Sequence, residues 1–183
     1  MQNSLRRLIT LTIATALAGL IGTAASFAVV IGATGGPLLR IDTRSDTADA
    51  QTTSISFVNL PGAQVRITIP PAGGSRLVVA RFSAESGCGG AAAGALCLVR
   101  IIALNTGTAL PTEMHPQAGT DSAFDTVPGQ TIDNVTDFFE SHSLERPLRL
   151  DPGTYLIRVQ WAVSAANTFF DLDDWHLTVS QYD

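Results

Sequence analysis

The sequence predicts an all-β fold, an antiparallel β-sandwich of jelly-roll type with about nine strands. Alternating apolar and polar residues recur in short segments, and turns rich in proline or glycine separate these segments at intervals of about ten residues. No stretch after the N-terminal segment keeps a helical period. The clearest strand is 155–163, in which Tyr155, Ile157, Val159 and Trp161 share one face. These observations favour two packed antiparallel sheets.

The other strands are predicted from the same alternation and from the turns that bound it. The segments 76–84 and 96–104 flank a glycine-rich loop and are expected to form a hairpin. Residues 105–135 contain several prolines and are expected to be mostly irregular. The turn signal Asp151-Pro152-Gly153 precedes the clearest strand. The expected strands are 54–58, 63–69, 76–84, 96–104, 122–126, 137–144, 155–163 and, after a short loop, two more short strands.

The first 28 residues have the composition of an export signal. Arg6 and Arg7 form a basic start, an apolar stretch follows, and small residues precede a cleavage position after Ala25 or Ala28. Because no charge occurs between Arg7 and Arg40, the segment also fits an uncleaved anchor helix. Both interpretations place the rest of the chain outside the cell or on its surface. The expected division is 1–28 as signal peptide or anchor, 29–53 as linker or arm, and 54–183 as the sandwich domain.

The charge of the chain argues against several classes of partner. It has 11 basic residues, all arginine, and 16 acidic residues, which gives a net charge of −5 at pH 7. Nucleic acids and anionic lipids are bound by basic patches, which this balance disfavours. We therefore expect no nucleic-acid partner, and no membrane contact apart from an uncleaved N-terminal anchor. The arginine-only composition, rich in alanine and glycine, is typical of bacterial proteins.

The two cysteines, Cys88 and Cys97, are expected to form a disulfide, because disulfides persist in exported proteins. A loop of this length is stabilised by about 2–3 kcal/mol in the chain-entropy model of cross-linking. The spacing of the two cysteines fits neither a CxxC redox pair nor a four-ligand zinc site. A metal or redox role is therefore the weaker interpretation.

The aromatic residues support two interpretations. Exposed tryptophans can stack on sugar rings, so Trp161 and Trp175 are candidates for a carbohydrate platform. Each of them also shares its strand face with aliphatic residues, which favours a place in the core. Phenylalanines occur in two adjacent pairs, at 138–139 and 169–170, and one member of each pair is expected to face outward. Core tryptophans with some exposed phenylalanine surface are the primary expectation.

Three carboxylates near the C-terminus, those of Asp171, Asp173 and Asp174, form the first candidate site. The apolar face changes parity at this point, since Leu172 belongs to one face and Trp175 to the other. A β-bulge or a break at Asp173-Asp174 would explain the change. Carboxylates at a bulge are candidate calcium ligands, although no DxDxDG-type loop accompanies them. Turn capping or ion pairing with arginine are the alternatives.

The second candidate site is the segment 140–146, which contains Glu140 and His142. Ser141 and His142 are neighbours in a strand and point to opposite faces, so they do not form a nucleophile–base pair with each other. His142 is instead expected to pair with a carboxylate, from Asp121 or Asp125. A structural hydrogen-bond network is the primary interpretation of this segment.

The phrases GTYLIRVQWAV and FFDLDDWHLTV resemble the closing strands of jelly rolls in bacterial exported and phage-type proteins. Together with the fragment ARFSAES they are similar to the tumour-necrosis-factor and complement-head superfamily, in which the FSA phrase opens the domain. The resemblance implies a jelly-roll architecture and a homo-oligomer, a trimer in that superfamily, and it transfers no functional residue. The phrases FSAES, ESHS and DDW also resemble an uncharacterised group of secreted actinobacterial-type proteins.

No catalytic motif accompanies these features, since the sequence contains neither a GxSxG elbow nor an HExxH pair. The primary expectation is a secreted or cell-surface β-sandwich without catalytic activity, a structural or interaction module that binds a protein or a glycan. A carbohydrate-binding module is the first alternative. A hydrolase that uses carboxylates of Asp121, Asp125 and Glu140 is the second, and it needs two carboxyl groups about 5–10 Å apart. No cofactor is expected other than calcium.

Overall fold

A computed structural model describes residues 32–90, 93–117, 123–127 and 139–183 of the chain. All regular structure in these residues is β-strand. The ten strands are β1 (Leu38–Asp46), β2 (Ala50–Thr52), β3 (Val58–Ile69), β4 (Arg76–Gly90), β5 (Leu96–Asn105), β6 (Pro111–Glu113), β7 (Asp125–Thr126), β8 (Glu140–Leu150), β9 (Gly153–Val163) and β10 (Thr168–Tyr182).

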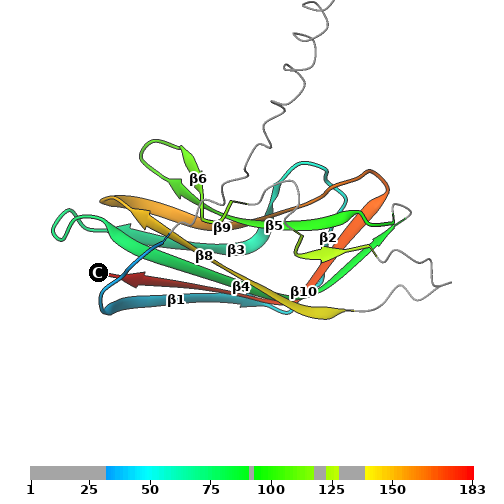
Figure 1. The fold of residues 1–183 in the computed structure, drawn as a ribbon, viewed down its shortest axis with the longest axis horizontal. Coiled ribbons are helices and arrows are strands. Elements are labelled where there is room, and N and C mark those ends of the chain that lie inside the picture. Colours follow the sequence, from blue (N-terminus) through cyan, green and yellow to red (C-terminus); the bar gives the residue numbers. More distant parts are fainter. Residues whose placement is uncertain (1–31, 91–92, 118–122, 128–138) are drawn as a thin grey trace, which may run out of the picture. The chain divides into compact units, whose positions relative to one another are not determined.

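The strands form two antiparallel sheets that pack face to face (Figure 1). Sheet A has the order β1-β10-β4-β8, and β2 also pairs with β10. Sheet B has the order β3-β9-β5-β6, and β7 also pairs with β5. The pairs are nested along the chain: β5 with β6 and β7, β4 with β8, β3 with β9, and β1 with β10. Nested pairs of this kind arise when one long hairpin is rolled up, which is the jelly-roll arrangement. The predicted fold class is therefore confirmed.

The core lies between the sheets and is built mainly from residues that alternate along the strands. In β9 the side chains of Tyr155, Ile157, Val159 and Trp161 are buried, as their parity predicts. Trp161 and Trp175 are each only 3% exposed, so the expectation that both belong to the core is confirmed. The buried aromatic residues lie within contact distance of one another: Phe82 with Phe124 and Trp175, and Phe170 with Phe124 and Trp161.

Several strands are longer than the sequence predicts. The expected strand 63–69 begins earlier, at Val58, because a register shift between Asn59 and Gln64 lets β3 continue past Pro61-Gly62. β8 likewise runs through Pro147, which an edge strand tolerates because one side of its backbone needs no donor. The segment expected to be a linker or arm, 29–53, contains β1 and β2, both hydrogen-bonded to β10.

The expected hairpin of 76–84 and 96–104 is wrong. β4 belongs to sheet A and β5 to sheet B, so the loop between them crosses from one sheet to the other. A loop of small, glycine-rich residues is compatible both with a hairpin and with a connection between two sheets, so the local sequence does not distinguish them. Within the described ranges no helix is long and apolar enough to cross a membrane. The expected signal or anchor, 1–28, lies outside the described residues.

Candidate functional site

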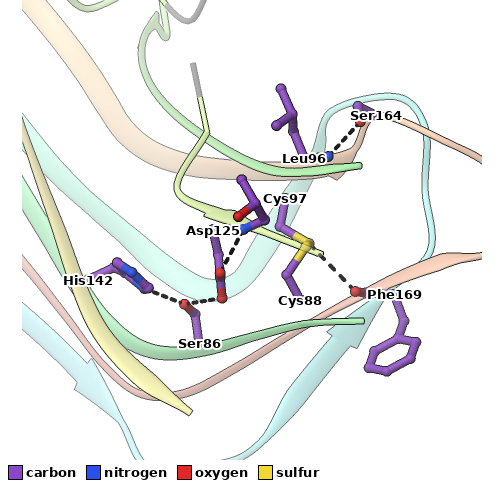
Figure 2. Close-up of a disulfide and its surroundings, with 9 residues drawn as sticks. Ser86, Cys88, Leu96, Cys97, Asp125, His142, Ser164 and Phe169 are labelled. Atoms are coloured by element: carbon purple, nitrogen blue, oxygen red, sulfur yellow. Dashed lines mark hydrogen bonds between the residues drawn. A yellow bond between two sulfur atoms is a disulfide. The ribbon is translucent and has the colours of Figure 1, made fainter. Parts of the chain in front are cut away.

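The expected disulfide between Cys88 and Cys97 is present, with a sulfur–sulfur distance of 2.04 Å (Figure 2). Because Cys88 lies in β4 and Cys97 in β5, the bond joins sheet A to sheet B. The Cys97 sulfur also lies 3.5 Å from the carbonyl oxygen of Phe169. This is a contact rather than a hydrogen bond, since a disulfide sulfur carries no hydrogen. The disulfide is therefore a covalent link through the sandwich.

A chain of three polar side chains lies next to the disulfide, and we call Asp125, Ser86 and His142 the polar chain (Figure 2). Ser86 Oγ lies 2.9 Å from Asp125 Oδ2 and 2.8 Å from His142 Nδ1. Ser86 has no exposed surface, whereas the His142 side chain is 30% exposed. His142 Nε2 lies 3.8 Å from Oε2 of Glu140, whose side chain is 72% exposed. The polar chain thus runs from the half-buried Asp125 of β7 through the buried Ser86 of β4 to the partly exposed His142 of β8.

Strand parity places these groups together. Ser86 continues the inward face of β4, which Phe82 and Ala84 occupy before it. His142 is directly opposite Ala84 in the β4–β8 pairing and therefore points to the same face. Asp125 is opposite Cys97 in sheet B and reaches Ser86 between the sheets. Three strands from both sheets thus supply the three members of the polar chain.

The hydrogen-bond inventory assigns a donor to each contact. An ionised carboxylate only accepts, so the hydroxyl hydrogen of Ser86 goes to Asp125. Ser86 Oγ then accepts from His142, which puts the imidazole hydrogen on Nδ1. The remaining nitrogen, Nε2, is the one near Glu140. Protonation of His142 at Nε2 would convert that contact into an ion pair.

This order differs from that of a serine hydrolase. In a catalytic triad the imidazole lies between the serine and the carboxylate and accepts the hydroxyl hydrogen. In the polar chain the serine lies in the middle, its hydrogen is donated to Asp125, and a substrate has no access to its buried oxygen. The geometry therefore suits a partly buried network that connects β4, β7 and β8.

A cavity of about 450 Å³ has His142 of the polar chain in its lining. It is lined by β8 from His142 to Arg146 on one side and by Val99, Ala123 and Phe124 on the other. Burial lowers the pKa of the Arg146 guanidinium, and the Glu113 carboxylate acts in the opposite direction. Only 123–124 of the irregular region 105–135 lines this cavity, and residues 118–122 and 128–138 lie outside the described part of the chain.

The structure brings part of the predicted second site together. His142 reaches Asp125 through Ser86, and Glu140 lies beside the same ring. Asp121, the other expected partner, lies outside the described residues. Sequence reasoning missed Ser86, although a signal was present: it is a hydroxyl residue on the inward parity of an otherwise apolar strand face. Such a residue needs a buried partner, which Asp125 and His142 supply.

We expect the change Ser86→Ala to lower the free energy of unfolding by about 1–3 kcal/mol, because it leaves two half-buried polar groups without their shared partner. Urea unfolding followed by tryptophan fluorescence measures the effect. Ser143→Ala is the matched control, since Ser143 is exposed on the opposite face of β8 and its loss is expected to cost no more than about 0.5 kcal/mol. Equal stability of the two variants would contradict the proposed importance of the polar chain.

The first predicted site, at Asp171, Asp173 and Asp174, contains the expected bulge. The β10–β4 register shifts between Asp173 and His176, and Asp174 has a positive φ of 45°. Burial changes parity there, from Leu172 to Trp175. Asp173 Oδ1 accepts a hydrogen bond of 2.8 Å from the backbone N–H of Asp174, so this carboxylate stabilises the bulge. Of the arginines that could pair with these carboxylates, Arg100 contacts Gln160 and Glu113, and Arg158 contacts Gln64.

The structure does not bring these carboxylates together as a metal centre. Among the described residues, no group of three or more His, Cys, Asp and Glu side chains is arranged to hold a metal ion. Binding of calcium at Asp171, Asp173 and Asp174 stays a prediction.

We expect Asp174→Val to destabilise the protein by about 1–2 kcal/mol, because a β-branched residue is strained at positive φ. Asp174→Gly is the matched variant, and its stability is expected to equal or exceed that of the wild type, since glycine adopts this conformation freely. Thermal unfolding of the two variants measures the difference. If Val and Gly gave the same melting temperature, the bulge would not depend on this backbone conformation.

Comparisons with known proteins assign the chain to no family. No protein-family model matches it, and no curated protein matches it. Among solved structures it is similar to dimeric latent PorU from Porphyromonas gingivalis, at 10% identity and a TM-score of 0.31. That match covers 83% of this chain and 14% of the PorU chain, so the chain spans a small part of that protein's length. A likeness of this size carries no argument about function.

Proposed function

We propose that this protein is an exported β-sandwich that works as a non-catalytic interaction module at the cell surface or outside the cell. The observation that carries the proposal is the disulfide between the sheets. Disulfides form and persist in oxidising compartments and are rare in the cytosol. Cys88 and Cys97 come from different sheets, so the bond contributes to the tertiary structure itself. The N-terminal segment with the composition of an export signal supports the same compartment.

The polar chain supports the absence of catalysis. A nucleophile must reach the substrate, and Ser86 is fully buried with its hydroxyl hydrogen donated to Asp125. The Nδ1 atom of His142 is hydrogen-bonded to the same hydroxyl group. These groups bind one another, which is the behaviour of a network that stabilises the sandwich.

The alternatives have less support. Both tryptophans proposed for a carbohydrate platform are buried in the core, which leaves Phe139, 42% exposed, as a candidate for stacking on a sugar. For a carboxylate-dependent hydrolase, Asp125 and Glu140 lie at the two ends of the network around His142, and neither lines the cavity beside His142. The interaction module remains the function that these residues favour.

Two measurements test the proposal. The chain is produced with its N-terminal segment in a bacterial host, and we expect the protein to be exported with no free thiol. The purified protein is then assayed on ester, peptide and glycan substrates beside His142→Ala and Glu140→Ala, and we expect no turnover. Turnover that either substitution abolishes would overturn the absence of catalysis. Retention in the cytoplasm with both thiols free would overturn export.

A further inference from the structure

β1 forms the outer edge of sheet A, beside β10 (Figure 1). All of its residues except Asp42 are exposed. Its pairing with β10 is regular only from Arg40 to Asp46, because the register shifts between Leu38 and Arg40 and the strand ends at Asp46. The regular stretch is therefore centred on Thr43. On the side away from β10, no other strand of the described chain pairs with it, and a strand edge of this kind is a template for a further strand.

The charges on this stretch alternate in sign on one face. Arg40, Asp42, Arg44 and Asp46 have the same parity and lie opposite inward-facing residues of β10. Arg40 Nε already pairs with Asp42 Oδ2 at 2.7 Å within the strand. Charged residues that point inward from an edge strand normally prevent another strand from adding, since they would be left without partners beside the core. An added strand is therefore accepted only if it brings the complementary charges.

The complementary strand is the same sequence read in the opposite direction. If two copies pair antiparallel about a two-fold axis through Thr43, Arg40 lies opposite Asp46 of the second copy and Asp42 lies opposite Arg44. All eight charges then face an opposite charge. If the antiparallel register is shifted so that Asp42 lies opposite Asp42 of the second copy, Arg40 lies opposite Arg44, and only like charges meet. A parallel pairing in register also places each charge opposite a like charge. The centre of charge symmetry coincides with the centre of the regular stretch.

We propose that β1 is a self-recognition edge, through which two copies of this chain join their A sheets into one continuous antiparallel sheet. The proposal deepens the proposed function, because it names a second copy of the chain as a partner of the interaction module. Complementary charges provide the attraction, and the repulsion in the antiparallel register shifted by two residues and in the parallel pairing provides specificity against those arrangements. An isologous contact of this kind closes on itself, so it gives a dimer rather than a filament.

A charge-swap experiment tests the pairing in the exported protein. One variant carries Arg40→Asp with Arg44→Asp, and the other carries Asp42→Arg with Asp46→Arg. Light scattering after size-exclusion chromatography is expected to give a dimeric mass for the wild type, a monomeric mass for each variant alone, and a dimeric mass for their mixture. A wild type that stays monomeric at all concentrations, a trimer, or a dimer that neither variant disrupts would overturn the proposal.

Cysteine trapping tests the register, and it decides the question should the charge variants fail to fold. In the proposed pairing Thr43 faces Thr43, with Cβ atoms about 5 Å apart, whereas the two copies of Ile41 are separated by about 14 Å. We expect Thr43→Cys to give a disulfide-linked dimer on mild oxidation and Ile41→Cys to stay monomeric. Cross-linking of Ile41→Cys in place of Thr43→Cys, or of neither, would overturn this pairing. A monomeric protein without enzymatic turnover would leave the proposed function standing.

Discussion

Replacing both Cys88 and Cys97 by alanine is expected to lower the free energy of unfolding by about 3 kcal/mol. The two residues are separated by 9 positions, and the chain-entropy model gives this magnitude for a loop of that length. For a domain of about 150 residues, such a loss corresponds to a fall in melting temperature of roughly 6–12 °C. Because the bond joins the two sheets, its loss weakens the contact between β4 and β5, which have no shared ladder.

The single variants provide the control for this experiment. Cys88→Ala and Cys97→Ala each remove the cross-link while leaving one thiol, so both are expected to match the double variant within about 1 kcal/mol. Reduction of the wild type should approach the same stability. Calorimetry under identical conditions measures all four. If the double variant melted with the wild type, the disulfide would be a consequence of the fold rather than one of its supports.

Phe170→Ala is expected to be the most damaging core substitution, with a loss of about 3–5 kcal/mol. The ring of Phe170 has no exposed surface, and its centroid lies 5.6 Å from that of Trp161 and 6.3 Å from that of Phe124. Its removal leaves a cavity where the aromatic residues of both sheets meet. Chemical denaturation measures the loss, and a red shift of the Trp161 emission reports the entry of water.

Phe139→Ala is the control for Phe170→Ala. Phe139 is 42% exposed, and its truncation is expected to change stability by no more than about 0.5–1 kcal/mol. A loss at Phe139 comparable to that at Phe170 would show that the core is organised differently. The same pair also tests the carbohydrate alternative, because a role in sugar binding would make Phe139→Ala change binding on a glycan array while stability is preserved.

The C-terminal strands show how far the sequence determines the fold. Side-chain parity along a strand has a period of two, so the change of face between Leu172 and Trp175 predicts a bulge, and the structure has one there. The burial of Trp161 and Trp175 follows from the same parity. These predictions succeed because they depend only on residues that are neighbours in sequence. The predicted class of fold is confirmed for the same reason, since it summarises many local patterns.

Predictions that depend on distant residues were less successful. The sequence between β4 and β5 does not reveal whether the next strand joins the same sheet, so it predicts a hairpin where the chain crosses between the sheets. The polar chain needs residues from three strands: the β4–β8 pairing within sheet A brings Ser86 and His142 together, and only the packing of the two sheets adds Asp125. The sequence also predicts strands that are too short, because Pro61-Gly62 and Pro147 act as turn signals locally but lie within strands.

The nested strand pairs have a consequence for the order in which the chain becomes native. Sheet A needs β10 between β1 and β4, so neither of these strands has its main partner until β10 has been synthesised. Contacts between such distant positions give a high contact order, and folds of this kind reach their native state in milliseconds to seconds. The chain is therefore expected to stay incompletely folded during synthesis, a state that suits the proposed export through a channel for unfolded polypeptides.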